Sequence, residues 1–263
     1  MAKSKIIKDL VSDKITINQA MDRLLVICME IGDANTIQWI KNEKDGYDGS
    51  EIKKYRITRV QAFGDYELIS LGQRCIYQNR ILPTMGVDED MIKKWNEFFI
   101  RWGINSLQEQ KKALDSGKFG GIPIPPEMFF MFEKNTNIQV TKAFLYVSPQ
   151  SIGNILDRIK MLLIEILVTY EKNFGNLDDF DIDLKDYDVD EIEKFKEVTN
   201  SILNGKNSGN IIVINNSKIK NSNIGSGNKI EKKTELTADI TIPKNENKAN
   251  IFKWLFNKIF KGK

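Results

Sequence analysis

A long helix from Ser148 to Tyr170 is the prediction on which the rest of the expected fold depends. Ser148 followed by Pro149 is a typical helix start, because serine caps free amide groups and proline tolerates the first helical position. A helix with a wide apolar face has to be covered on several sides. Apolar residues recur there at helical spacing: Ile152, Ile155, Leu156, Ile159, Leu162, Leu163, Ile166, Leu167 and Tyr170.

Further helix signals lie near the N-terminus. Ser4 is a candidate cap for a short first helix. Thr16 and Gln19 have the spacing of a capping box, in which each side chain binds the other residue's backbone amide. Asp33 is a candidate cap for a third helix that ends near Gly46. The sequence therefore predicts a helical N-terminal bundle.

Strand-like sequence follows this bundle. Residues 55–63 and 66–71 are rich in β-branched and aromatic residues, and Gly64-Asp65 between them predicts a turn. Residues 74–82 predict a third strand, and the alternation over residues 138–147 predicts a fourth. We expect these strands to form one small antiparallel sheet.

Two more segments separate the third and fourth strands. Helical spacing from Asp88 predicts a helix that includes Phe98, Phe99 and Trp102. Residues 117–126 contain three glycines and three prolines, which predicts a loop. The fold class is therefore α+β: a helical N-terminal bundle packed with a small antiparallel sheet and a long closing helix. A low-complexity β-prone segment and a short C-terminal amphipathic helix follow.

The low-complexity segment has isoleucines at a spacing that fits no helix. Asparagine and glycine between them favour turns, so the pattern is typical of short strands separated by corners. One such unit cannot bury its isoleucines, whereas stacked copies from several chains bury them and align their asparagines. A polar linker without regular structure is the alternative. The predicted self-association residues are Ile214, Ile219, Asn221, Ile224, Gly227, Asn228 and Ile230.

Residues 251–260 predict an amphipathic helix with lysines on its polar side. At about 1.5 Å per residue this helix is too short to cross a hydrocarbon core of about 30 Å. It fits an interfacial helix that lies in the membrane surface, or one that packs on its own domain. The predicted membrane-interacting residues are Phe252, Trp254, Leu255, Phe256, Ile259 and Phe260.

Composition excludes several kinds of site. The chain has no histidine, which excludes a Ser-His-Asp triad and a histidine-based zinc site. Asp179, Asp181 and Asp183 have the spacing of a calcium loop, but Leu184 stands where that loop needs glycine. We therefore predict no catalytic, cofactor-binding or metal-binding residues. The enzyme question stays open, with a non-enzymatic role favoured.

Two cysteines and four arginines are the remaining candidates for functional groups. Cys28 and Cys75 are interpreted as core or half-buried residues. Four arginines on or near the predicted strands are interpreted as ordinary exposed sheet positions, with a phosphate- or RNA-binding face as the alternative. The net charge is only +3, so nucleic acid is not the expected partner. These arginines are Arg56, Arg59, Arg74 and Arg80.

Residues 1 to about 175 resemble the AbiTii domain of bacterial abortive-infection proteins. Four stretches carry the resemblance in the same order: 39–47 (WIKNEKDGY), 54–56 (KYR), 122–128 (IPIPPEM) and 148–167 (SPQSIGNILDRIKMLLIEIL). The resemblance implies a role in phage defence through arrest of the infected host. It carries no catalytic motif, so it assigns no active-site residue.

We therefore divide the chain into an AbiTii-like α+β domain (1–175), an acidic connector and helix (176–204), a self-association segment (205–246) and an amphipathic helix (247–263). The leading hypothesis is a homo-oligomer that perturbs the membrane with its C-terminal helices. The N-terminus has no secretory signal and no stretch approaches about 18 apolar residues, so we expect a cytoplasmic protein with peripheral contact at the inner face of the plasma membrane. Two alternatives are a toxic enzyme or nucleic-acid-binding domain in residues 1–200, and a sensor for a partner protein encoded nearby.

Overall fold

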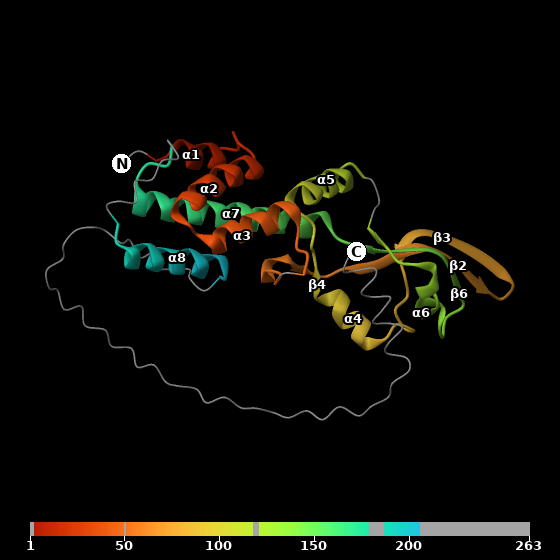
Figure 1. The fold of residues 1–263 in the computed structure, drawn as a ribbon. Coiled ribbons are helices and arrows are strands. Elements are labelled where there is room, and N and C mark those ends of the chain that lie inside the picture. Colours follow the sequence, from red (N-terminus) through yellow and green to blue (C-terminus); the bar gives the residue numbers. More distant parts are fainter. Residues whose placement is uncertain (1–2, 50, 118–120, 179–186, 206–263) are drawn as a thin grey trace, which may run out of the picture. The chain divides into compact units, whose positions relative to one another are not determined.

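The computed structural model describes residues 3–49, 51–117, 121–178 and 187–205 (Figure 1). These residues form helices and small antiparallel sheets, which confirms the predicted α+β class. The predicted low-complexity segment and C-terminal helix lie outside the described residues. The helices are α1 (Lys5–Val11), α2 (Ile17–Ile31), α3 (Ala34–Asp45), η1 (Lys54–Arg56), α4 (Glu89–Asn96), α5 (Ile104–Asp115), η2 (Pro126–Met128), α6 (Phe130–Glu133), α7 (Pro149–Phe174) and α8 (Val189–Leu203). The strands are β1 (Ile57–Thr58), β2 (Gln61–Ser70), β3 (Gln73–Ile81), β4 (Phe98–Phe99), β5 (Ile122–Pro123) and β6 (Ile138–Tyr146).

Helix α7 is the long helix that the sequence predicts. Its start is confirmed, because the Ser148 hydroxyl accepts a hydrogen bond from the Ser151 amide at 3.1 Å and Pro149 occupies the first position. Every apolar residue named for its wide face is buried. Helices α1, α2, α5 and α8 all pack against it (Figure 1). The expected covering of α7 on several sides is therefore confirmed.

Two of the three predicted N-terminal caps are confirmed. Thr16 and Gln19 form the capping box of α2, with hydrogen bonds of 3.1 and 2.9 Å. The Asp33 carboxylate accepts from the Thr36 amide at 3.1 Å and caps α3, which ends at Gly46. Local sequence decides these helix ends, because donor and acceptor lie three residues apart.

Ser4 precedes α1 but does not cap it. The Ser4 hydroxyl instead donates to Glu171 at 2.7 Å and accepts from the Leu177 amide at 3.0 Å. Lys3 pairs with the same carboxylate, with 2.5 Å between Lys3 Nζ and Glu171 Oε2. The Leu177 amide uses the hydroxyl oxygen that would otherwise accept from a helix amide, and the Glu171 carboxylate, which is only 9% exposed, takes the hydroxyl proton. Long-range partners therefore replace the local one.

Glu171→Gln is expected to reduce the loss of stability at acid pH. Burial raises the pKa of Glu171, but hydrogen bonds from Lys3 and Ser4 outweigh it, so its pKa lies below the usual 4.5. A carboxyl with a lowered folded pKa stabilises the fold above its unfolded pKa and loses that contribution as pH falls through the folded value. Urea unfolding from neutral to acid pH measures the slope. Asp115→Asn, in an exposed pair with Lys111, is the control, and equal slopes in wild type and Glu171→Gln would contradict the prediction.

The larger sheet has the strand order β3-β2-β6-β5, with all neighbours antiparallel. The strands predicted at 74–82 and 138–147 are confirmed as β3 and β6. The turn predicted at Gly64-Asp65 is wrong, because β2 is continuous there and turns at Leu71-Gly72. A Cβ on Gly64 would collide with the Lys142 carbonyl oxygen of the neighbouring strand. Gly64 therefore allows close strand approach rather than a chain reversal.

Two other local predictions need correction. Helix α4 ends at Asn96, and Phe98–Phe99 forms β4, which pairs with β1 instead of extending the helix to Trp102. Residues 122–123, expected in a loop, form β5 against β6. Pro123 is tolerated there because β5 is the last strand of the sheet, where a missing N–H leaves no ladder bond unmade.

Candidate functional site on the sheet

The residues predicted for self-association and for membrane contact lie in residues 206–263, outside the described residues. The acidic triplet at 179, 181 and 183 also lies outside them. Within the described parts of the chain, no three His, Cys, Asp or Glu side chains come together as metal ligands. The described site candidates are therefore two buried polar clusters and the surface of the larger sheet.

The first cluster is a buried ion pair between Glu43 of α3 and Arg56 of η1, both with fully buried side chains. The Arg56 guanidinium also donates to the carbonyl oxygens of Ile100 at 3.2 Å and Trp102 at 2.6 Å. This corrects the interpretation of Arg56 as an exposed sheet residue. A buried guanidinium needs such a set of acceptors to offset its lost hydration.

Tyrosines complete the cluster around the Glu43 carboxylate. The hydroxyls of Tyr47 and Tyr55 donate to its Oε1 at 2.5 and 2.6 Å, and Trp39 donates to the Tyr55 oxygen at 2.9 Å. Burial and then the Glu43 charge raise the pKa of Tyr47 and of Tyr55, so both stay protonated donors. Arg56 lies 4.8 Å from the centre of the Tyr47 ring. The groups bind one another below the surface, and this geometry fits a structural link between α3 and the strand region.

The second cluster surrounds Asp33 and attaches α8 to the helices. One Asp33 oxygen accepts from the hydroxyls of Thr36 at 2.7 Å, Tyr170 at 2.9 Å and Thr199 at 2.9 Å. Cys28 lies 3.2 Å from the Tyr170 hydroxyl, and burial raises the pKa of its thiol. Cys28 is thus a core residue, as expected, and its raised pKa disfavours the reactive thiolate.

The two faces of the larger sheet differ. Along β6, Val140, Ala143 and Leu145 share one face and are buried, and η2 and α6 pack against this strand. We call the opposite face the outer face. The strand register places on it the alternating β2 residues 61, 63, 65, 67 and 69 and their neighbours, including Ile81 opposite Phe63 and Ile76 opposite Glu67.

The arginine face that was the alternative to ordinary exposed positions does not form. Arg59 lies between β1 and β2, and Arg74 pairs with Glu67 on the outer face. Arg80 lies opposite Gly64 and therefore on the other face. With Arg56 buried, the four arginines do not share a surface. The prediction that Cys75 is a core or half-buried residue is also wrong, because Cys75 is exposed on β3.

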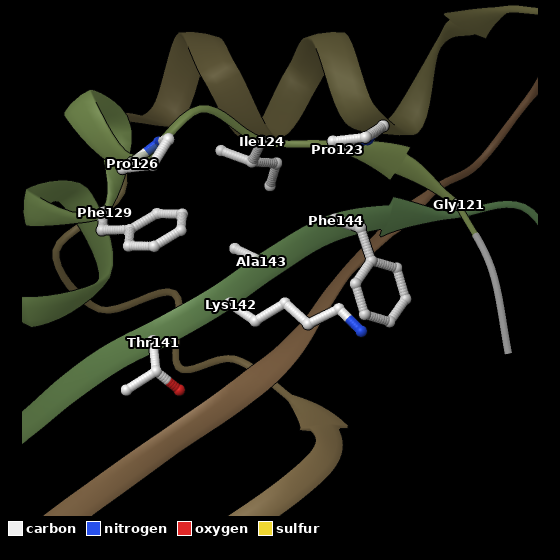
Figure 2. Close-up of a pocket in the computed structure, with 9 residues that line it drawn as sticks. All are labelled: Gly121, Pro123, Ile124, Pro126, Phe129, Thr141, Lys142, Ala143 and Phe144. Carbon is white, nitrogen blue, oxygen red and sulfur yellow. The ribbon is translucent and has the colours of Figure 1, made fainter.

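A groove of about 350 Å³ lies where β5 and η2 meet β6 (Figure 2). Thr141 and Lys142 carry polar groups in its lining, and the Lys142 ammonium lies 5.8 Å from the centre of the Phe144 ring. This size is at the lower end for ligand pockets, and the surface suits an apolar group beside an anionic one. Its lining is Gly121, Pro123, Ile124, Pro126, Phe129, Thr141, Lys142, Ala143 and Phe144.

Neither the Glu43–Arg56 pair nor the Asp33 cluster is evident from the sequence. Glu43 and Arg56 both fall in stretches that carry the family resemblance, 39–47 and 54–56. That location was the one sequence feature that could have pointed to them. Nothing in the spacing says that these side chains face each other, because the contact depends on the path of the chain between α3 and η1.

Comparison with known proteins gives one family. The AbiTii family model matches residues 4–195, from the start of α1 into α8. No curated protein and no solved structure matches the chain significantly. Among the described residues, no helix is both long and apolar enough to span a membrane. The family match covers well over half of the chain, and the protein therefore belongs to the AbiTii family and carries a domain of abortive-infection defence against phages.

Proposed function

We propose that the protein defends the bacterial population by arresting the infected cell. The C-terminal residues carry out this arrest, and the AbiTii domain is the folded unit to which they are attached. Residues 214–230 bring chains together, and the clustered 251–260 segments act on the inner face of the plasma membrane. The sequence of 251–260 carries this proposal, since it combines a continuous apolar face with lysines on the polar side. One short helix binds membranes weakly, whereas several held in one assembly gain avidity.

The attachment of α8 supports this arrangement. Thr199 binds the buried Asp33, and the ring of Phe195 contacts those of Tyr170 and Phe174 at centroid distances of 4.6 and 4.7 Å. Helix α8 is therefore anchored by polar and aromatic contacts up to the point where the asparagine-rich sequence begins. An assembly of that sequence would carry the folded domains with it.

Phe252→Glu with Phe256→Glu is expected to abolish membrane leakage and phage protection. Two carboxylates on the apolar face oppose burial in the lipid interface. The measurements are dye release from liposomes with anionic lipids and survival of phage-challenged cells that carry the full chain. Asn250→Glu with Asn257→Glu, on the polar side, is the matched control, because it adds the same two acidic residues and removes no lysine.

Loss of both activities in the phenylalanine variant, with leakage retained in the control, supports the proposal. Equal leakage from the phenylalanine variant and wild type would remove residues 251–260 from the mechanism. Phage protection that is retained without membrane leakage would mean that the folded domain, and not residues 251–260, is responsible for protection.

A sensor role for the domain is the second candidate, and the groove beside β6 favours it. Lys142 and the apolar lining around Pro123 and Phe129 form a surface for a partner with an apolar and an anionic group (Figure 2). Co-purification of a partner encoded nearby with wild type but not with Lys142→Glu would support this role.

A further inference from the structure

We propose that the outer face of the sheet is an interface with a second copy of this chain. Its most exposed apolar residues are three isoleucines, with relative residue exposures of 52%, 67% and 56% at Ile69, Ile76 and Ile81. The register places all three on the same face of β2 and β3. Solvent-facing sheet positions are normally polar, so a row of exposed isoleucines indicates a surface that is covered in the working protein.

The turn of the same hairpin supports this view independently. Leu71 is fully exposed and has a φ of 49°, in the left-handed region. Two-residue hairpin turns favour asparagine or aspartate there, because a bulky side chain is disfavoured in this backbone conformation. Leucine at this site therefore improves neither the turn nor the solvation of the isolated domain. Contact with a partner gives this side chain a role that folding does not.

The charges of the outer face fit a symmetric contact. The register places Asp65 and Glu67 on it together with Lys142 and Arg74. In a two-fold dimer the same patch meets itself, so a surface of one sign would repel its copy. Glu67 and Arg74 neutralise each other within one copy, and Asp65 lies beside Lys142 on the neighbouring strand, so Asp65 of one copy can meet Lys142 of the other across the axis. This self-compatibility is why a second copy is the proposed partner.

The contact is expected face to face rather than along the edge of β3. The pairing of β2 and β3 is irregular between Gly64 and Tyr66, and Asn79 on β3 has a φ of 49°. Such a bulge interrupts the row of backbone groups that an added strand would need. Two sheet faces instead pack about 10 Å apart with interdigitating side chains. The dimer would then be a sandwich of two hairpins.

This inference deepens the proposed assembly but does not depend on residues 214–230. To separate the two, the full chain carries Ile219→Lys and Ile224→Lys, which remove apolar side chains of the asparagine-rich segment. In that background we expect a dimer by sedimentation. Adding Ile76→Lys and Ile81→Lys is expected to give monomers, because charges replace the apolar centre of the patch. Gln73→Lys with Cys75→Lys is the matched control, since both residues are exposed on the opposite face of β3 and should leave the dimer intact.

Circular dichroism establishes that each variant is folded, and all four positions on β3 are exposed. A monomer before any change on the sheet would overturn the proposed interface, as would a dimer that survives Ile76→Lys and Ile81→Lys. Monomers from both β3 variants would also contradict it, because the effect would not belong to the outer face. Larger assemblies that persist despite Ile219→Lys and Ile224→Lys would instead count against the asparagine-rich segment.

Discussion

Arg56→Ala is expected to lower the free energy of unfolding by about 3–5 kcal/mol, the usual cost of removing one partner of a buried ion pair. Arg56 and Glu43 are both fully buried. The substitution leaves the Glu43 carboxylate with the Tyr47 and Tyr55 hydroxyls as donors and leaves the carbonyls of Ile100 and Trp102 without theirs. Domains are stable by only about 5–15 kcal/mol, so a large part of the stability would be lost.

Thermal unfolding followed by circular dichroism measures this loss as a fall in Tm of about 10 °C. Lys44→Ala is the control on the same helix, because Lys44 pairs with an Asp22 that is largely in solvent and should change Tm little. Glu43→Gln combined with Arg56→Met is expected to cost less than Arg56→Ala, since it leaves no charge buried alone. A Tm for Arg56→Ala equal to that of Lys44→Ala would contradict the structural role of the pair.

Gly64→Ala is expected to be the second large effect, about 3 kcal/mol of lost stability from overpacking in a central strand. The added Cβ collides with the Lys142 backbone oxygen, and a backbone atom within a paired strand cannot move aside as a flexible side chain can. Relief requires separation of β2 from β6 at the level where their register already shifts.

Gly72→Ala provides the comparison, because no atom lies within 4 Å of the new methyl group there. Its cost is limited to the left-handed backbone at φ 77°, about 1 kcal/mol. Urea unfolding of both variants separates the two causes. If Gly72→Ala cost as much as Gly64→Ala, close strand approach would not be the reason for glycine at position 64.

Features that depend on neighbours in the chain were predictable. The capping box at Thr16 and Gln19, the cap at Asp33 and the start of α7 at Ser148 each involve groups three residues apart. The wide apolar face of α7 could also be predicted from the sequence, because helical periodicity alone brings those side chains to one side of the helix.

Features that depend on distant partners were missed or misjudged. Gly64 has the sequence signature of a turn, but Lys142 on another strand decides its role. Ser4 has the signature of a cap, but Glu171 binds its hydroxyl. Phe98 and Phe99 continue a helical spacing, but pairing with Ile57 and Thr58 makes them a strand.

The sequence by itself determined the starts of α2, α3 and α7, the apolar face of α7, the α+β class and the resemblance to AbiTii domains, because short-range hydrogen bonds and periodic burial depend on neighbouring residues. Only the tertiary structure decided that Arg56 is buried against Glu43, that Asp33 holds α8, and that Ile69, Ile76 and Ile81 share an exposed face. The contacts of Arg56 and Asp33 depend on which segments the chain brings together, and no local spacing encodes that choice. The shared face of the isoleucines depends on the hairpin turn at Leu71-Gly72, whereas the residues between the strands predicted a turn at Gly64-Asp65.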